Sequence, residues 1–217
     1  MMNKYSLLIP LLLFVTVTKA QRTIELSHYL FPEFTKGSVM MKDGTETSAM
    51  LNYNAVTREM IFQQNGRVLA LADPTLSLTD TVRIEDRKFV LFDDEFVEVL
   101  LQEDTKLMTC YRCKIIPPGN PAPFGGTSQT SSVDNYSTYR SGNMVYELKL
   151  PDDYKIEPNN IYYLDNGSGW KKINSMRQLK KIYKKKKERF DQYVSEQKIQ
   201  FNDPVGIAEL VEWLERE

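Results

Sequence analysis

Short apolar segments recur about every ten residues between positions 39 and 116, and this recurrence restricts the fold more than any other feature of the sequence. Two of the intervening turns, Asp43-Gly44 and Asn65-Gly66, favour the type I′ turn of a β-hairpin because both central residues take a positive φ. No helical pattern separates the segments, which disfavours a parallel α/β fold. We therefore expect an antiparallel sheet curled into a roll or small barrel. The predicted strands are 39–41, 49–53, 60–62, 68–71, 82–84, 89–92, 96–100 and 107–116.

From residue 174 onward the apolar positions follow the period of a helix. We expect one helix capped by Asn174 or Ser175, and a second opened by Asp203-Pro204, with Asp as the N-cap and Pro in the first turn. The two would form a helical hairpin that packs on itself or on the sheet, which makes the fold α+β. The predicted buried positions are Met176, Leu179, Tyr183, Phe190, Val194, Ile207, Leu210, Val211 and Leu214.

The segment between the sheet and the helices is irregular at first. Residues 117–135 hold four prolines, three glycines and five serine or threonine residues, so regular structure should stop there. Two interpretations are open: a mobile excursion, or an ordered loop, with Phe124 at its tip, that covers a groove or contacts a partner. A strand at 144–150 and a hairpin around Gly167 would then complete the sheet.

The N-terminus has the features of a secretory signal peptide. Lys4 precedes an apolar run of 13 residues, and Thr18-Lys19-Ala20 offers small residues for cleavage before Gln21. The alternative is a membrane anchor, but a spanning helix needs about 20 apolar residues. We expect an exported, periplasmic or secreted, mature chain that begins at Gln21. The predicted divisions are 1–20 signal peptide, 21–116 β domain, 117–135 loop, 136–173 returning strands and 174–217 helical pair.

Charge is distributed unevenly along the chain. Residues 80–104 contain nine acids and three bases, whereas residues 171–189 contain ten bases and one acid. Within the second stretch, the four consecutive lysines Lys184, Lys185, Lys186 and Lys187 could contact an anionic membrane surface, at about 1 kcal/mol each. The alternative, which we favour, is a solvated helix face. Nucleic acid is not expected as a partner of an exported protein.

Several short motifs spread over the mature chain form a signature. It comprises Phe31-Pro32-Glu33-Phe34, Gly37-Ser38-Val39, Lys42-Asp43-Gly44, Leu51-Asn52-Tyr53-Asn54, Thr57, Glu59-Met60, Leu69-Ala70-Leu71-Ala72 and the run 125–131. Together with a Tyr-Tyr-Leu strand that leads into lysine-rich helices, this signature resembles a family of uncharacterised exported proteins of the Bacteroidota. The resemblance implies export and brings no activity with it. The two cysteines are not part of the pattern.

Cys110 and Cys113 form a C-x-x-C motif, the most specific candidate for chemistry. In a redox enzyme Cys110 would attack and Cys113 would resolve, and Arg112 could lower a thiol pKa. However, redox motifs of this kind usually lie at a helix N-terminus, and this one lies in a predicted strand. Extended residues three apart are about 10 Å apart, too far for a disulfide without a bulge. A structural disulfide at a bulge and a reduced buried pair remain the alternatives.

Other candidate groups are weaker. His28 is the single histidine and lacks a nearby companion ligand, so a partly buried structural role is expected. The acids Asp93, Asp94 and Glu95 lack the spacing of a calcium loop and fit a solvated turn better than a carboxylate pair. The stretch Gly125–Ser128 lacks the lysine of a phosphate-binding loop. We therefore predict no catalytic, cofactor-binding or metal site.

These observations favour an exported, non-catalytic interaction or structural protein of the cell envelope with an unknown protein or envelope partner. The reason is that no group of residues reaches the spacing that nucleophilic, metal or acid–base chemistry requires. Two alternatives from other classes remain. One is a thiol-based enzyme that uses Cys110 and Cys113, and the other is a peripheral binder of anionic membranes through the lysine-rich helix.

Overall fold

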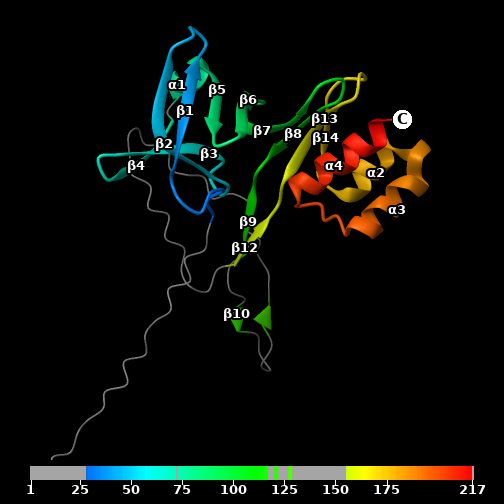
Figure 1. The fold of residues 1–217 in the computed structure, drawn as a ribbon. Coiled ribbons are helices and arrows are strands. Elements are labelled where there is room, and N and C mark those ends of the chain that lie inside the picture. Colours follow the sequence, from blue (N-terminus) through cyan, green and yellow to red (C-terminus); the bar gives the residue numbers. More distant parts are fainter. Residues whose placement is uncertain (1–27, 72, 117–119, 122–126, 129–154, 217) are drawn as a thin grey trace, which may run out of the picture.

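The computed structural model describes residues 28–71, 73–116, 120–121, 127–128 and 155–216. The chain has the predicted α+β fold, with a large antiparallel sheet followed by C-terminal helices (Figure 1). Ten strands form this sheet in the order β14-β13-β8-β7-β6-β5-β1-β2-β3-β4. Among the described residues the two outermost strands do not pair with each other, so the sheet is open, and of the two predicted forms, a roll or a small barrel, the closed barrel does not occur.

The strands confirm the segments predicted from the sequence between residues 39 and 100, and the last predicted segment, 107–116, is divided into two strands. In the main sheet they are β1 (Thr35–Met41), β2 (Glu46–Asn54), β3 (Glu59–Gln64), β4 (Arg67–Ala70), β5 (Thr79–Ile84), β6 (Arg87–Phe92), β7 (Glu95–Gln102), β8 (Lys106–Cys110), β13 (Ile161–Asp165) and β14 (Lys171–Ile173). Two small ribbons accompany it, β9 (Cys113–Ile116) with β12 (Lys155–Pro158), and β10 (Asn120–Pro121) with β11 (Thr127–Ser128). The predicted strand at 144–150 lies outside the described residues.

The hairpin turns follow their sequences in two of three cases. Asn65 and Gly66 both have positive φ, as expected for a type I′ turn. The consecutive acids Asp93 and Asp94 also have positive φ and form the tight turn between β6 and β7. At Asp43-Gly44 the predicted hairpin is present, since β1 pairs with β2, but the turn is not of type I′, because only the glycine has positive φ. The Asp43 carboxylate accepts a hydrogen bond from the Thr45 amide at 2.8 Å, which holds the aspartate in a different turn.

Two predicted elements are interrupted, and one element is new. The strand expected over 107–116 breaks at Tyr111 and Arg112, so that β8 joins the main sheet and β9 leaves it to pair with β12. The first C-terminal helix is divided into α2 (Met176–Ile182), a 3-10 turn η1 (Lys184–Lys186) and α3 (Lys187–Gln197). The short helix α1 (Asp73–Leu78), which the sequence analysis did not predict, follows β4.

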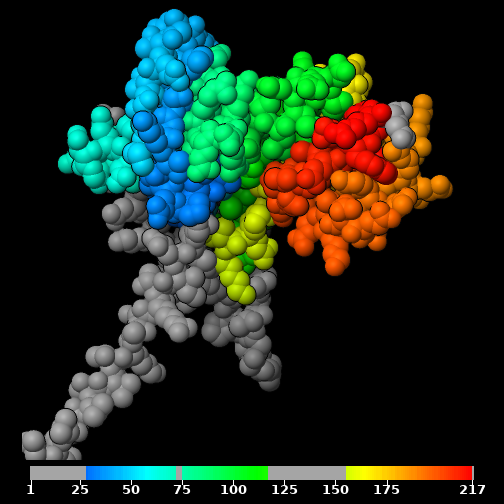
Figure 2. All heavy atoms as spheres, in the orientation of Figure 1, coloured from blue at the N-terminus to red at the C-terminus, as the bar shows by residue number. Residues whose placement is uncertain are grey.

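The C-terminal helices lie against one end of the sheet (Figures 1 and 2). Ser175 caps α2 and Asp203 caps α4 (Pro204–Glu215), and each side chain accepts a hydrogen bond from an amide of the first turn. The faces that these helices present to each other and to β8, β13 and β14 form one buried cluster. Its members are Leu107, Tyr162, Leu164, Ile173, Leu179, Tyr183, Phe190, Ile207, Leu210, Val211 and Leu214. The helical pair therefore packs both on itself and on the sheet.

Candidate functional site

A basic groove runs along the outer side of the first two C-terminal helical segments. It has a volume of about 680 Å³, and all the side chains that line it are polar. We call this hollow the basic groove, and its lining residues are Ser175, Arg177, Gln178, Lys180, Lys181, Lys184 and Lys187. Five of the seven are lysine or arginine and none is acidic, so the groove concentrates positive charge in a concave surface.

The groove follows from the helical period of the sequence. Arg177, Lys180, Lys181 and Lys184 are spaced i, i+3, i+4 and i+7, which places them on one side of a helix. Leu179 and Tyr183 fall on the opposite side, where they are buried in the core. Packing of the apolar face on the sheet thereby fixes the basic face outward.

The four consecutive lysines do not act as one unit. Lys184 and Lys187 line the basic groove, whereas Lys185 is exposed outside it. Lys186 is half-buried, and its ammonium group donates a hydrogen bond to the carbonyl oxygen of Leu214 near the end of α4. The last carbonyl groups of a helix lack partners within the helix and attract cations, so Lys186 stabilises the packing of η1 on α4.

Acidic side chains near the groove neutralise little of its charge. Lys180 donates a hydrogen bond to Asp191 on α3 at 2.7 Å. Glu215 instead accepts a hydrogen bond from the Tyr183 hydroxyl at 2.7 Å, within the interface between the helices. Within the described part of the chain, the other four cations of the groove have no acidic partner. A bound anion would therefore meet largely uncompensated positive charge.

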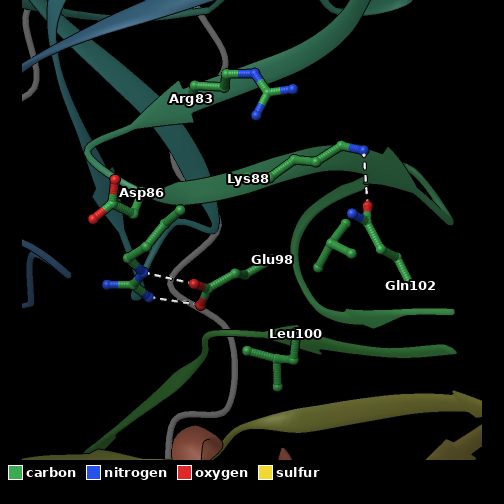
Figure 3. A pocket seen from close by; sticks show the side chains of 8 residues that line it. Arg83, Asp86, Lys88, Glu98, Leu100 and Gln102 are labelled. Carbon is green, nitrogen blue, oxygen red and sulfur yellow. Dashed lines mark hydrogen bonds and ion pairs between the residues drawn. The ribbon is translucent and has the colours of Figure 1, made fainter. Parts of the chain in front are cut away.

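A second, smaller cavity of about 210 Å³ lies where β5, β6 and β7 meet (Figure 3). It is lined by Arg83, Asp86, Arg87, Lys88, Glu98, Val99, Leu100 and Gln102. Unlike the basic groove, it carries both signs of charge. Figure 3 shows Lys88 directed to Gln102 and away from the Glu98 carboxylate. The Lys88 ammonium nitrogen lies 3.3 Å from the Gln102 amide oxygen.

The Glu98 carboxylate at this cavity is fully engaged by its neighbours. Arg87 donates two hydrogen bonds of 2.7 Å to it, and the Tyr111 hydroxyl donates a third. The Arg87 guanidinium also lies over the rings of Phe31 and Phe89, at 4.8 and 5.5 Å from their centroids. A carboxylate held by three donors is a poor general base, so this ion pair has the features of a structural contact that links β6 and β7 to the strand break.

The cysteine motif is located at the break between β8 and β9. Cys110 ends β8 and is buried, Cys113 begins β9 and is half-buried, and both are free thiols. The Cys110 thiol donates a hydrogen bond to Glu95 at 3.3 Å. Glu95 also binds Arg58, at 2.6 Å, and Arg112. The buried Cys110 is therefore part of a partly exposed network centred on the Glu95 carboxylate.

This network disfavours the thiolate form. Burial raises the pKa of Cys110 to about 11, and the negative charge of Glu95 also raises it, which outweighs the opposing effect of Arg112. Burial alone raises the pKa of Cys113 to about 11. At pH 7 the thiolate of either residue is then about one part in ten thousand. Arg112 does act to lower the pKa of Cys110, as the sequence suggested, but burial and Glu95 raise that pKa by more, so the thiol is not activated.

The remaining sequence candidates have structural surroundings. His28 is half-buried, as predicted, and its backbone carbonyl accepts a hydrogen bond from the Ala55 amide at 2.9 Å. Asp93 and Asp94 form the exposed turn described above. Among the residues that the structure describes, no group of three or more histidine, cysteine or acidic side chains could hold a metal ion. Residues 125 and 126 lie outside that part of the chain.

The sequence analysis identified two residues of the basic groove and missed the others. It singled out Lys184 and Lys187 because they belong to an uninterrupted run of charge. It did not single out Arg177, Lys180 or Lys181, although their helical spacing to Lys184 indicates a basic face. The network around Glu95 was also missed, since its members are far apart in the sequence and only the sheet brings them together.

Comparisons with known proteins add no assignment. No family model, no curated protein and no solved structure matches this chain. The resemblance to exported proteins of the Bacteroidota therefore remains a prediction. In the described segments no helix is long and apolar enough to cross a membrane. The geometry of the groove, the mixed cavity and the thiol network is the basis for any functional conclusion.

Proposed function

We propose that this chain is an exported, non-catalytic interaction protein of the cell envelope that binds an anionic partner through the basic groove. The observation that carries the proposal is the lining of the groove, which brings five cations together without an acidic residue. Like charges held together on one surface repel one another, and an anion relieves that repulsion. Because buried packing on the inner side fixes the backbone of these segments, the points from which the charged side chains extend keep a constant arrangement.

The other groups capable of chemistry support binding rather than catalysis. A thiol-based enzyme requires an accessible thiolate, whereas Cys110 is buried and the pKa of both thiols is about 11. Acid–base chemistry requires a carboxylate free to exchange a proton, whereas Glu95 and Glu98 are each held by hydrogen bonds from arginine. These features weigh against the enzyme alternative.

The test compares two double charge reversals that change the net charge equally. Lys181→Glu with Lys184→Glu alters the groove, and Lys36→Glu with Arg67→Glu alters exposed positions on β1 and β4 that lie outside it. Binding of the mature protein to dextran sulfate beads and to phosphatidylglycerol vesicles is measured at low salt, with circular dichroism to confirm folding.

We expect the groove variant to lose binding to at least one of the two probes and the control variant to keep it. Moderate salt should also abolish the binding of the unaltered protein, because exposed charges are screened within about 10 Å at 0.1 M salt. Equal loss in both double variants, or absence of binding to both probes, would contradict the proposed function.

A further inference from the structure

We infer that the anionic partner of the basic groove is a second copy of this chain, which inserts its acidic turn between β6 and β7 into the groove. This inference rests on the proposed function and names the partner of the same site. Three observations carry it: charges of both signs that are not neutralised within one chain, the shapes of the groove and of the turn, and an exposed tryptophan beside the turn.

The basic and acidic stretches of the sequence do not neutralise each other within one chain. Among the described residues, the single acidic partner of the groove is Asp191, which binds Lys180 and lies on the neighbouring helix α3. Asp93 and Asp94 are exposed, and neither has a cationic partner in the described segments. The formal net charge of the whole sequence is only −1, so two copies repel each other little. Separate surfaces of opposite sign then favour contact between copies.

The acidic turn is a compact hairpin tip. Asp93 and Asp94 are the two residues that connect Phe92, the last of β6, with Glu95, the first of β7, and both have a positive φ. A two-residue connection of this kind is tight, and the paired strands on either side hold it in place. The turn therefore presents two adjacent carboxylates on a narrow projection.

The shape of the groove suits such a tip. Arg177 and Lys181 lie one turn apart on α2, with about 5–6 Å between their Cβ atoms. Lys184 and Lys187 belong to η1 and α3, beyond the break of the helix at Tyr183. The cations thus surround a hollow of about 680 Å³ from three segments. A compact acidic tip can contact several of them at once.

Trp170 gives the acidic turn an apolar neighbour. This side chain is 42% exposed and lies beside Phe92, with 5.0 Å between the ring centroids. Lysine and arginine have hydrocarbon stems that cover apolar surface, and their charged ends bind the faces of aromatic rings. The groove of one copy can therefore cover the indole of the other while its cations pair with the two carboxylates. A small inorganic anion offers no such apolar contact.

The first experiment removes the two charges of the turn and leaves its backbone intact. Asp93→Asn with Asp94→Asn keeps side chains that tolerate a positive φ, so the turn should persist. The matched control, Glu103→Gln with Asp104→Asn, removes the same charge from exposed positions between β7 and β8. Sedimentation equilibrium of the mature chain over a series of concentrations at low salt measures the association constant of each protein.

We expect the unaltered chain to associate weakly, because a contact of this kind is at the small end of specific interfaces. Moderate salt should make it monomeric, since exposed charges are then screened. The variant with Asn at both positions of the turn should associate up to about 25-fold less tightly, because each exposed ion pair contributes up to about fivefold. Trp170→Ala should also weaken association, and the control variant should match the unaltered chain. Dextran sulfate should dissociate the complex by competition for the groove.

A charge exchange tests whether the turn and the groove contact each other. Lys181→Glu with Lys184→Glu reverses the groove, and Asp93→Lys with Asp94→Lys reverses the turn, so each protein alone should lose association. A mixture of the two should associate again, because the acidic turn of the first meets the unaltered groove of the second. Circular dichroism checks that each variant folds. If the lysine variant of the turn unfolds, the asparagine variant replaces it in the mixture, since its groove is also unaltered.

The other outcomes separate the two proposals. A chain that stays monomeric at low salt, yet binds dextran sulfate through the groove, would overturn the second copy as partner and leave the proposed function intact. Equal weakening in the asparagine variant and its control, or no recovery in the mixture, would overturn docking of this turn. Association that persists when the groove is reversed would also overturn it. Absence of self-association together with absence of binding to dextran sulfate and to vesicles would contradict both proposals.

Discussion

Replacement of Leu210 by alanine tests the packing that fixes the basic groove in place. Leu210 lies on α4, is completely buried, and is flanked by Ile207, Val211 and Leu214, which are buried to the same extent. The cluster that contains them also holds Leu179 from α2 and side chains of β8, β13 and β14. A cavity at this position therefore weakens the contact between the sheet and all the C-terminal helices.

The expected cost follows from the size of the change. Leu210→Ala removes three side-chain carbons, equivalent to three CH2 groups, and at about 0.8 kcal/mol each the lost burial costs about 2.4 kcal/mol. If the neighbours do not move, a void of roughly 80 Å³ adds about 2 kcal/mol at 24 cal/mol per Å³. The total range is about 2–5 kcal/mol. We expect the upper half of it, because the surrounding side chains are themselves fully buried and have little room to relax.

The assay is urea unfolding followed both by the fluorescence of the two tryptophans and by far-ultraviolet circular dichroism. The midpoint should fall while the slope m stays constant, since the surface exposed on unfolding hardly changes. Val205→Ala, at a position 65% exposed on the same helix, and Lys185→Ala should each change stability by no more than about 0.5 kcal/mol. A cost below about 1 kcal/mol for Leu210→Ala, or a larger cost for Lys185→Ala, would refute the assignment of the buried face.

Three further predictions concern the thiols, the Glu95 carboxylate and export. In the native state Cys113 should react slowly with an uncharged alkylating reagent, and Cys110 should react only after unfolding; peptide mass spectrometry measures both. Labelling of Cys110 faster than Cys113 in the native state would contradict the burial of Cys110. Burial acts to raise the pKa of Glu95, but the hydrogen bond and the charge of Arg112 outweigh it, so the pKa is lower in the folded than in the unfolded protein. The ionised Glu95 therefore stabilises the fold above about pH 4.3, and this contribution is lost as the pH falls through the pKa of the folded state. Urea melts at falling pH should therefore show the stability advantage over Glu95→Gln shrinking, and an advantage that grows in acid would contradict the network. Intact mass of the envelope form should correspond to a chain that begins at Gln21, and retention of residue 1 would contradict signal cleavage.

Local sequence patterns predicted most of the fold correctly. Alternation of apolar residues between recognisable turns located the strands, and the caps Ser175 and Asp203 located the helix starts, because both signals depend on neighbouring residues. The turn at Asp43-Gly44 was wrong because a side chain, Asp43, supplies a competing hydrogen bond to the Thr45 amide. The sequence could not decide between a roll and a small barrel, since closure depends on pairing between strands that are distant in the sequence.

The candidate site was predicted only in part for a related reason. A run of four lysines is conspicuous in the sequence, but the 3-10 turn at 184–186 determines which of them share a surface. It leaves Lys184 and Lys187 beside Arg177 and directs Lys186 to the end of α4. At the break, Tyr183 and Lys186 donate hydrogen bonds to Glu215 and to the Leu214 carbonyl at the end of α4, distant contacts that the local pattern does not encode. The network of Glu95 required the same knowledge of distant contacts.

The most direct measurement of where an anionic partner binds is a titration of the isotope-labelled mature protein with dextran sulfate of low molecular mass, followed by the shifts of backbone amide resonances. The account predicts that the largest changes fall on residues 177–187, that they saturate, and that they disappear in the Lys181→Glu, Lys184→Glu variant. Changes that instead centre on Arg83 and Lys88 at the smaller cavity, or that persist in that variant, would contradict the assignment of the basic groove as the binding site.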